Sequence, residues 1–456
     1  MTSAFASGLK DPGLFVEKAF IDWQWVASQS NVTFNVCNPA SEALVGTCPE
    51  SNTEDLNDAI QAAARAFPTW RSVSGRQRGR ILRRWADLLL DNKEDIGRII
   101  TAENGKAKAD AEGEAVFAAS FFEWFAEEAP RIYGDVVPHS SPTSRTQVLK
   151  EPVGVCGLIT PWNFPIAMGA RKVAAALAAG CTIVLKSGGL MPFASNVMAT
   201  LGEQAGVPNG VFNVVTALTN TPSLGRLLCE TEISSHTLRK VSLELGGNAP
   251  FIVFDDAGVE AAVASALISK FKRLVQEVQK YKIGNGLEDA SVTHGPLTNG
   301  VAKVSQHIHD ALDKKATVLL GGNRLPALGA NFHELTILGD VDDSMQVTRE
   351  ETFGPLAALA RFSTEDEVVR RANDCDVGLV SYLMTSDLAR AHRVSERLEA
   401  CMVAINTGVV PDAAAPFGGV KYSGMGREGS KYGVEEYLNV KMIVTGGINT
   451  AHTAHL

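Results

Sequence analysis

Three apolar segments near the middle of the chain decide its fold: TQVLKEPVGVCGLIT at residues 146–160, CTIVLK at 181–186 and VFNVVTA at 211–217. Each has the β-branched composition of a buried strand. The residues between them, 166–179 and 193–205, have the composition of helices. Strands that alternate with helices indicate βαβ units in a parallel sheet. The sequence therefore predicts an α/β protein.

Amphipathic segments flank this centre. Apolar residues at three- and four-residue spacing predict helices at 54–66, 75–104, 110–129, 221–229 and 274–286. The strand–helix alternation resumes at 249–254 and continues to about residue 410. A block rich in Gly and charge at 416–444 ends in a strand-like tail, near 440–446. Because the chain has 456 residues and no linker of low complexity, we expect two or three domains joined by several chain crossings.

Charge and composition exclude several classes of protein. The formal net charge is −9 and no basic run stands out, so nucleic acid is not an expected partner. No uncharged apolar stretch reaches the length of a membrane span, and the N-terminus does not resemble a secretory signal. The seven cysteines form no CxxC pair, which indicates reduced thiols in a cytoplasmic protein and no metal site.

Four short segments carry polar residues next to expected strand ends: TPWNFP (160–165), KSGG (186–189), LELGGNAP (243–250) and EETFGP (350–355). In this order they resemble signatures of the aldehyde dehydrogenase superfamily, and the resemblance runs from about residue 20 to residue 447. It implies a Rossmann-type parallel-sheet cofactor domain, an α/β catalytic domain and a small β oligomerisation element. The corresponding residues are 1–140 with 152–248, 249–425, and 141–151 with 426–456.

The same resemblance implies catalytic roles for two residues. Asn163 would donate from its amide to the oxyanion that develops during acyl transfer. Glu244 would act as the general base that activates water. Without the other motifs, Asn163 could equally be a turn residue between two prolines, and Glu244 a structural carboxylate.

Cofactor contacts are implied at eight positions. They are Thr160, Pro161, Trp162, Lys186, Gly189, Leu245, Glu351 and Phe353. Lys186 would contact the adenosine ribose, Glu351 the nicotinamide ribose, and Phe353 the nicotinamide. Gly189 stands where the family usually has a glutamate that grips the ribose. Because a carboxylate there would repel a 2′-phosphate, its loss makes NADP plausible beside NAD. The structural alternatives are a surface lysine and an ordinary turn.

Within the superfamily the chain most resembles succinate-semialdehyde dehydrogenases, through strings such as WFAEE (124–128) and GREGSKYG (426–433). Arg171 matches a position that binds the substrate carboxylate in that group, as a cation would. Two other carboxylate contacts of that group have no counterpart here: an arginine just after the nucleophilic cysteine is absent, and Asp412 stands near the place of a serine pair, where it would repel a substrate carboxylate. The resemblance also implies a homo-oligomer, a dimer or tetramer, that acts in 4-aminobutyrate degradation.

One expected feature is absent. The family places a nucleophilic cysteine a few tens of residues after the glutamate, yet no cysteine lies between Cys229 and Cys375. A turn-to-helix junction for the cofactor pyrophosphate is also missing near 230–240. Without a thiolate there is no covalent intermediate from which hydride can leave. The sequence therefore leaves two hypotheses, an impaired NAD(P)-dependent aldehyde dehydrogenase and a non-catalytic relative that binds or pairs with an intact subunit.

Overall fold

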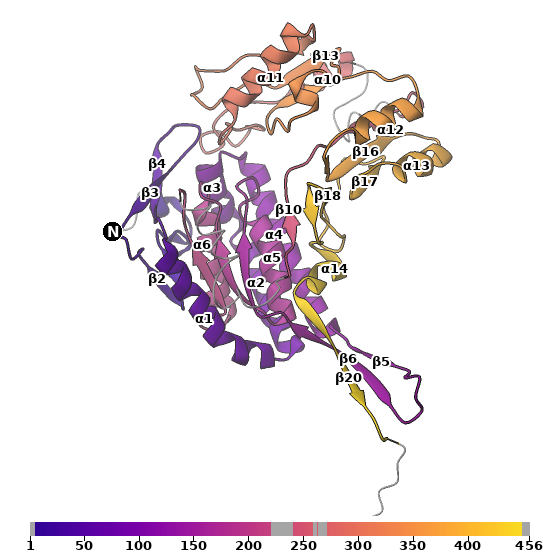
Figure 1. Ribbon diagram of the computed structural model, residues 1–456. Coiled ribbons are helices and arrows are strands. Elements are labelled where there is room, and N and C mark those ends of the chain that lie inside the picture. Colours follow the sequence, from indigo (N-terminus) through magenta and orange to yellow (C-terminus); the bar gives the residue numbers. More distant parts are fainter. Residues whose placement is uncertain (1–4, 220–239, 259–261, 263–270, 449–456) are drawn as a thin grey trace, which may run out of the picture.

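The computed structural model of this chain describes residues 5–219, 240–258, 262 and 271–448. Figure 1 shows a large α/β body from the N-terminal half, smaller sheets with their helices from the C-terminal half, and a β-arm that projects away from them. The helix expected near 221–229 lies outside the described residues, and so does Cys229.

A five-stranded sheet in the order β2-β1-β9-β8-β7 forms the centre of the N-terminal body. Its strands are β1 (Ala19–Ile21), β2 (Gln24–Val26), β7 (Val155–Ile159), β8 (Thr182–Lys186) and β9 (Phe212–Val215). β7, β8 and β9 are parallel, whereas β1 runs antiparallel to β9 and to β2. Helices α5 (Ala167–Ala179) and α6 (Pro192–Ala205) connect the parallel strands. The predicted βαβ units are confirmed.

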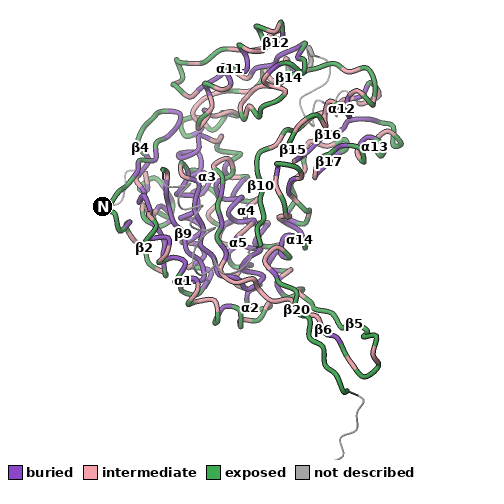
Figure 2. Tube along the Cα trace, viewed as in Figure 1, coloured by how far each residue is buried: buried purple, intermediate pink, exposed green. Residues whose placement is uncertain are grey.

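Helices cover both faces of this sheet. α1 (Thr53–Ser72) packs on one face, with Leu56 and Ile60 in a small core against β8 and β9. α5 and α6 pack on the other face. Behind them lie α2 (Gly75–Asp91), α3 (Lys93–Asn104) and α4 (Lys108–Glu128), which complete the main hydrophobic core. The strands β8 and β9 between these layers are buried along their whole length (Figure 2).

The prediction of one continuous helix over 75–104 was wrong at a single residue. α2 ends at Asp91 and α3 begins at Lys93. Between them the side-chain Nδ2 of Asn92 donates to the Leu88 carbonyl at 2.8 Å. An asparagine that bonds to nearby backbone competes with helix continuation. Apolar periodicity cannot detect this competition, because both helices keep the same buried stripe.

The C-terminal half forms two three-stranded sheets. The parallel sheet contains β11 (Phe251–Val253), β16 (Val380–Met384) and β17 (Met402–Ile405) with α12 (Glu365–Asn373) and α13 (Leu388–Ser395). The other sheet contains β12 (Thr317–Leu320), β13 (Thr336–Gly339) and β14 (Leu356–Ala358) with α11 (Val301–Asp313). The helix expected at 274–286 ends earlier than predicted, since α10 spans Phe271–Val278. In the loop that follows, the carbonyl of Lys282 accepts the N–H of Thr293.

Short elements complete the architecture. β3 (Thr33–Cys37) and β4 (Leu44–Pro49) form a hairpin, and β15 (Val377–Gly378) pairs with β18 (Val420–Lys421). Single 3₁₀ turns occur at Ala6–Gly8, Pro12–Leu14, Ala129–Arg131 and Gln346–Thr348. In the part of the chain that the structure covers, no helix is both long and apolar enough to cross a bilayer, and no cluster of residues could hold a metal ion.

The projecting arm is a three-stranded antiparallel sheet in the order β20-β6-β5. β20 (Leu438–Thr445) pairs with the whole of β6 (Arg145–Pro152), and β5 (Asp135–Val137) pairs with the other edge of β6. The sequence placed this element at 141–151 and 426–456. The structure adds β5 to it, whereas α14 (Ser430–Glu435) packs on α4 and α5 of the main body. Seven of the eight residues of β20 are exposed (Figure 2).

The outer strands of the central sheet, β2 and β7, each have one neighbouring strand in the part of the chain that the structure describes. Among the described residues, β7 pairs with β8 alone, and β10 (Leu243–Glu244) pairs with β19 (Gly424–Met425). Ile159, at the end of β7, is 43% exposed, and Leu243 is 40% exposed.

Candidate active site

The loop 160–165 leaves the carboxyl end of β7 and leads into α5. Thr160 is buried, and its backbone N–H and hydroxyl both donate to the carbonyl of Lys186, at 3.3 and 3.4 Å. The next residue, Pro161, lies against Gly188, where an added Cβ atom would come within 2.9 Å of the Pro161 carbonyl. Two segments that the sequence assigned to the cofactor site therefore meet at the carboxyl ends of neighbouring parallel strands, where ligands bind in sheets of this type.

Buried polar side chains hold the backbone of this loop. Nδ2 of Asn104 donates to the carbonyl of Trp162 at 3.0 Å, and Nζ of Lys106 donates to the carbonyl of Asn163 at 3.0 Å. Lys106 also pairs with Glu114 at 2.5 Å. The other oxygen of Glu114 accepts two backbone N–H groups at the N-terminus of α5, at 3.0 and 3.2 Å. The loop is thus fixed before any ligand arrives.

The Asn163 side chain is oriented by its own backbone. Its Oδ1 accepts the N–H of Phe164 at 3.1 Å, and Nδ2 makes no hydrogen bond within the described residues. The amide is therefore turned so that its donor end is available. Preplaced donors of this kind stabilise negative charge on an oxygen atom.

Lys186 lies at the end of β8 with its side chain almost entirely buried. Burial lowers the pKa of Lys186 to about 8, and the nearby carboxylate of Glu50 only partly opposes this. Gly189 lies close to the chain after β9, since an added Cβ atom would stand 3.0 Å from the carbonyl of Ala217. A buried ammonium group with so little compensation favours a negatively charged or strongly polar ligand.

Glu244 is the last residue of the short strand β10, and Leu245 follows it. The backbone N–H of Leu245 donates to the Ser423 carbonyl at 3.0 Å, and the Ser423 hydroxyl donates to the Gly246 carbonyl at 2.9 Å. The strand is therefore held from one side. Leu245 itself is exposed.

The electrostatic environment of Glu244 suits a base. Burial raises the pKa of its carboxyl group, and the carboxylates of Glu428 and Glu351 raise it further. Arg171 and Lys172 act in the opposite direction. A carboxyl group whose pKa moves toward neutrality is a better general base than one at its ordinary value.

The turn at 350–354 meets both other segments. The rings of Phe353 and Trp162 lie edge to face with centroids 5.0 Å apart. Glu351 lies beside Gly246, where an added Cβ atom would come within 2.6 Å of Oε2 of Glu351. Glu244, Glu351, Phe353 and Trp162 thus come from three segments far apart in sequence and converge on one place.

Arg171 has a different environment from the one expected. It is buried on α5, its Nε lies 2.5 Å from Oε2 of Glu428, and its guanidinium group stacks on Phe417 at 4.1 Å. Lys172 pairs with the other oxygen of Glu428. The sequence did not assign roles to Lys172 or Glu428, although Glu428 stands in the string 426–433 that carried the resemblance and Lys172 directly follows Arg171. The pair keeps Glu428 charged, because both cations lower the pKa of its carboxyl group against the effect of burial.

The cysteines that the structure describes lie elsewhere. Cys48, Cys156 and Cys181 are buried, and the thiol of Cys181 donates to the Tyr437 carbonyl at 3.4 Å. Burial raises the pKa of the Cys48 thiol well above its usual value, which makes it unreactive. Among the six described cysteines, none hydrogen-bonds to Asn163 or Glu244.

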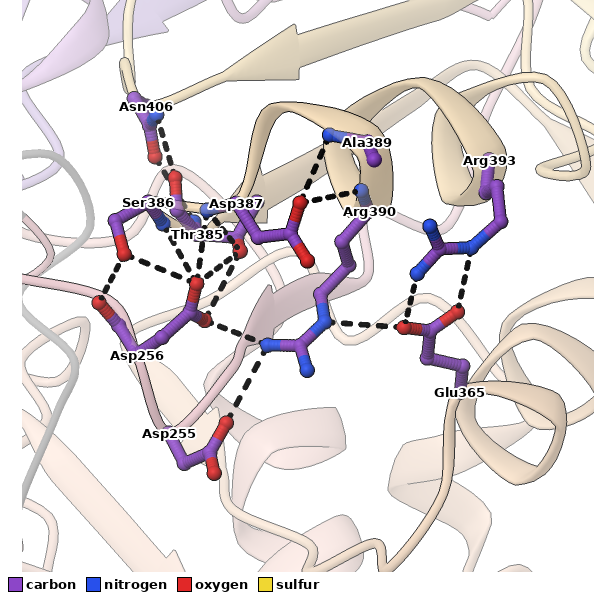
Figure 3. Close-up of polar contacts among 10 residues, drawn as sticks. All are labelled: Asp255, Asp256, Glu365, Thr385, Ser386, Asp387, Ala389, Arg390, Arg393 and Asn406. Carbon is purple, nitrogen blue, oxygen red and sulfur yellow. Dashed lines mark hydrogen bonds and ion pairs between the residues drawn. The ribbon is translucent and has the colours of Figure 1, made fainter.

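A second polar cluster lies at the carboxyl end of β11 (Figure 3). Asp256 accepts the Thr385 hydroxyl at 2.7 Å and the Ser386 N–H at 3.0 Å, and these bonds hold the pKa of its carboxyl group well below its usual range. Arg390 joins Asp256 to Glu365 at 2.7 and 3.0 Å. Because these charged groups pair with one another, the cluster braces β16 against α12 and α13 and leaves no free group for chemistry.

An α/β fold with polar side chains gathered at the carboxyl ends of its parallel strands is typical of nucleotide-binding enzymes. Comparison with known proteins makes this specific. The family model described as the aldehyde dehydrogenase family matches residues 25–232, 217–273 and 268–443. The chain belongs to the aldehyde dehydrogenase family, whose members oxidise aldehydes with NAD or NADP.

The similar proteins include semialdehyde dehydrogenases. A glutarate-semialdehyde dehydrogenase of Pseudomonas aeruginosa is 47% identical, over 96% of this chain and 100% of that protein. An NADP⁺-dependent succinate-semialdehyde dehydrogenase of Escherichia coli is 45% identical, over 96% of this chain and 99% of that protein. The crystal structure of a succinate-semialdehyde dehydrogenase from Burkholderia pseudomallei has a TM-score of 0.91 and 45% identity, over 96% of this chain and 100% of that chain.

This chain is shorter than the alignments that join it to these relatives. The alignment with the P. aeruginosa protein spans 483 positions, but 96% of this chain of 456 residues is only about 438 residues. About 45 aligned positions therefore have no counterpart here. The family match is divided at 217–232 and 268–273. These two places flank the strand that carries Glu244.

Proposed function

We propose that this chain is an NAD(P)-dependent semialdehyde dehydrogenase by descent, acting on a short aldehyde that carries a carboxylate. The observation that carries the proposal is the convergence of Glu244, Glu351, Phe353 and Trp162 at the carboxyl ends of the parallel strands. The relatives named for succinate and glutarate semialdehydes support the substrate class. The reaction would convert the aldehyde and water into a carboxylate and reduce the dinucleotide.

The residues present fit the two ends of a dinucleotide better than its pyrophosphate. Lys186 offers a buried cation near the adenosine end, and Gly189 places no carboxylate there that would repel a 2′-phosphate. Glu351 and Phe353 would hold the nicotinamide ribose and ring, with Trp162 behind them. The bound dinucleotide supplies a hydride acceptor. The junction that would grip the pyrophosphate has no counterpart in the sequence, so we expect weakened affinity.

The chain's own groups would act on the substrate in two ways. Asn163 would donate from Nδ2 to the aldehyde oxygen as negative charge develops there. Glu244, with its raised pKa, would accept a proton from the water that becomes part of the acid product. Arg171 would attract the distal carboxylate only if Glu428 released it, because the two are paired in a buried site.

We further propose that the positions missing from the alignment include the nucleophilic cysteine. No cysteine follows Glu244 before Cys375, and the family match is divided on both sides of the strand that carries Glu244. A chain without the thiolate would bind ligands and fail to turn over. A non-catalytic partner is the second candidate, favoured by the exposed strand β20, which could add to another subunit as part of a dimer or tetramer. Reduced cysteines suit a cytoplasmic location.

The test compares two forms of the protein. One is the chain with the printed sequence, and the other has the missing positions restored from the P. aeruginosa relative. We expect both to bind NADP⁺ and only the restored form to reduce it when succinate or glutarate semialdehyde is added. Glu244→Gln in the restored form should slow release of the acid. Aldehyde-dependent NADP⁺ reduction by the printed chain would refute the impairment, and an inactive restored form would refute the function.

A further inference from the structure

The turn that carries Glu351 and Phe353 rests on helix α11. Its residue Thr352 places Oγ1 2.9 Å from Nδ1 of His307, and the His307 side chain is completely buried. Gly354 lies so close to the helix that an added Cβ atom would stand 2.3 Å from Cγ2 of Val304. The chain before the turn is also held by α11, because Asp310 accepts the N–H of Gln346 at 2.7 Å. Helix α11 therefore contacts the turn itself and the chain that leads into it.

The backbone of the turn needs this support. Phe353 has φ 49°, in the left-handed region that residues other than glycine rarely adopt. Its ring is 46% exposed and contacts Trp162 across the site. A strained residue with a half-exposed ring persists only when its surroundings determine its conformation. The neighbouring Thr352 supplies the polar contact that does so.

The second nitrogen of His307 fixes its tautomer. Nε2 has no hydrogen-bond partner within the described residues, and Oε2 of Glu350 lies 3.6 Å from it. A bare lone pair facing a carboxylate is unfavourable, so the proton belongs on Nε2 and the Thr352 hydroxyl donates to Nδ1. Burial lowers the pKa of His307 and Lys303 lowers it further, whereas Glu350 and Asp310 oppose this. The imidazole is therefore neutral near neutral pH.

We propose that His307 is a positioning residue for the cofactor site: through Thr352 it holds the 350–354 turn so that Phe353 faces Trp162 and Glu351 faces the strand of Glu244. This inference rests on the proposed function for the role of Glu351 and Phe353. The link from His307 to the turn stands on the hydrogen bond and the burial alone.

The experiment measures hydrogen–deuterium exchange of the peptide backbone over residues 350–356 in the full chain without cofactor. His307→Leu keeps the volume and removes the hydrogen bond, and Thr352→Val removes the same bond from the other side. Each should speed exchange in this segment, and the double variant should add little, because both remove one interaction. His307→Asn should restore slow exchange, and His309→Leu, on the exposed face of α11, should leave it unchanged.

The affinity for NADP⁺ gives the second readout. His307→Leu and Thr352→Val should each weaken binding about tenfold, and His307→Asn should recover most of the loss. Unchanged exchange in either Leu or Val variant would overturn the positioning role. Faster exchange with unchanged affinity would overturn its connection to the cofactor site. A parent chain that binds no NADP⁺ counts against the proposed function alone, and the exchange data still decide the role of His307.

Discussion

The helical layer behind the central sheet and the strand that carries Glu244 belong to one chain but are stabilised very differently. In the helical layer, Trp85 is fully buried, with ring centroids 4.5 Å from Phe122 and 5.6 Å from Phe212. In contrast, β10 is two residues long and Leu243 is 40% exposed. The main hydrophobic core is therefore built by the helical layer and the central sheet, and β10 adds little to it. A chain that lacks about 45 positions of its relatives can therefore keep its core.

The largest effect should come from Trp85→Ala. Removing a fully buried indole leaves a cavity among α2, α4 and β9, which costs about 3–5 kcal/mol of unfolding free energy. Urea denaturation measures this loss. Tyr133→Ala removes an exposed ring and should change the same quantity by less than about 0.5 kcal/mol. If the two variants lost similar stability, the proposed contrast between core and surface would be wrong.

An intermediate effect should come from pH acting on Glu103. This buried carboxyl group accepts the N–H groups of Phe193 and Ala194 at 2.9 Å each, and burial raises its pKa to about 8. The pKa of Glu103 is higher in the folded protein than in the unfolded chain, so the native state holds an extra proton between about pH 4.5 and 8. The stabilisation is therefore complete below that window and is lost as pH rises through it.

The measurement is the free energy of unfolding at several pH values for the parent and for Glu103→Gln. The parent should lose at most about 1.4 kcal/mol for each pH unit within the window, and the variant should show a flatter profile. Glu123→Gln, on the exposed side of α4, should keep the slope of the parent. Equal slopes in the parent and Glu103→Gln would show that Glu103 ionises normally.

The smallest effect should come from Leu243→Thr. Leu243 is already exposed, so this change should alter the unfolding free energy by less than about 0.5 kcal/mol and reduce aggregation. Leu185→Thr, in the fully buried strand β8, is the matched control and should destabilise the protein clearly. Thermal unfolding and light scattering measure both outcomes. A large loss from Leu243→Thr would mean that β10 is packed against part of the chain or against a second copy.

Much of the architecture followed from sequence patterns. The strands at 181–186 and 211–217 and the helices at 166–179 and 193–205 were found within one to three residues of their ends, because each is bounded by turns and has a clear apolar period. The break at Asn92 and the early end of α10 were missed, because side-chain and loop hydrogen bonds decided them. The family was identified from motifs, and the catalytic roles of Asn163 and Glu244 stay predictions.

The sequence by itself determined the family, the parallel βαβ order and the absence of a cysteine between Cys229 and Cys375, since these are properties of residue order. Only the tertiary structure decided the environment of each functional group. It paired Arg171 with Glu428, buried Lys186, and brought Phe353 against Trp162 on a turn held by His307. Burial, charge pairing and backbone strain depend on residues distant in the chain, and no local pattern contains them.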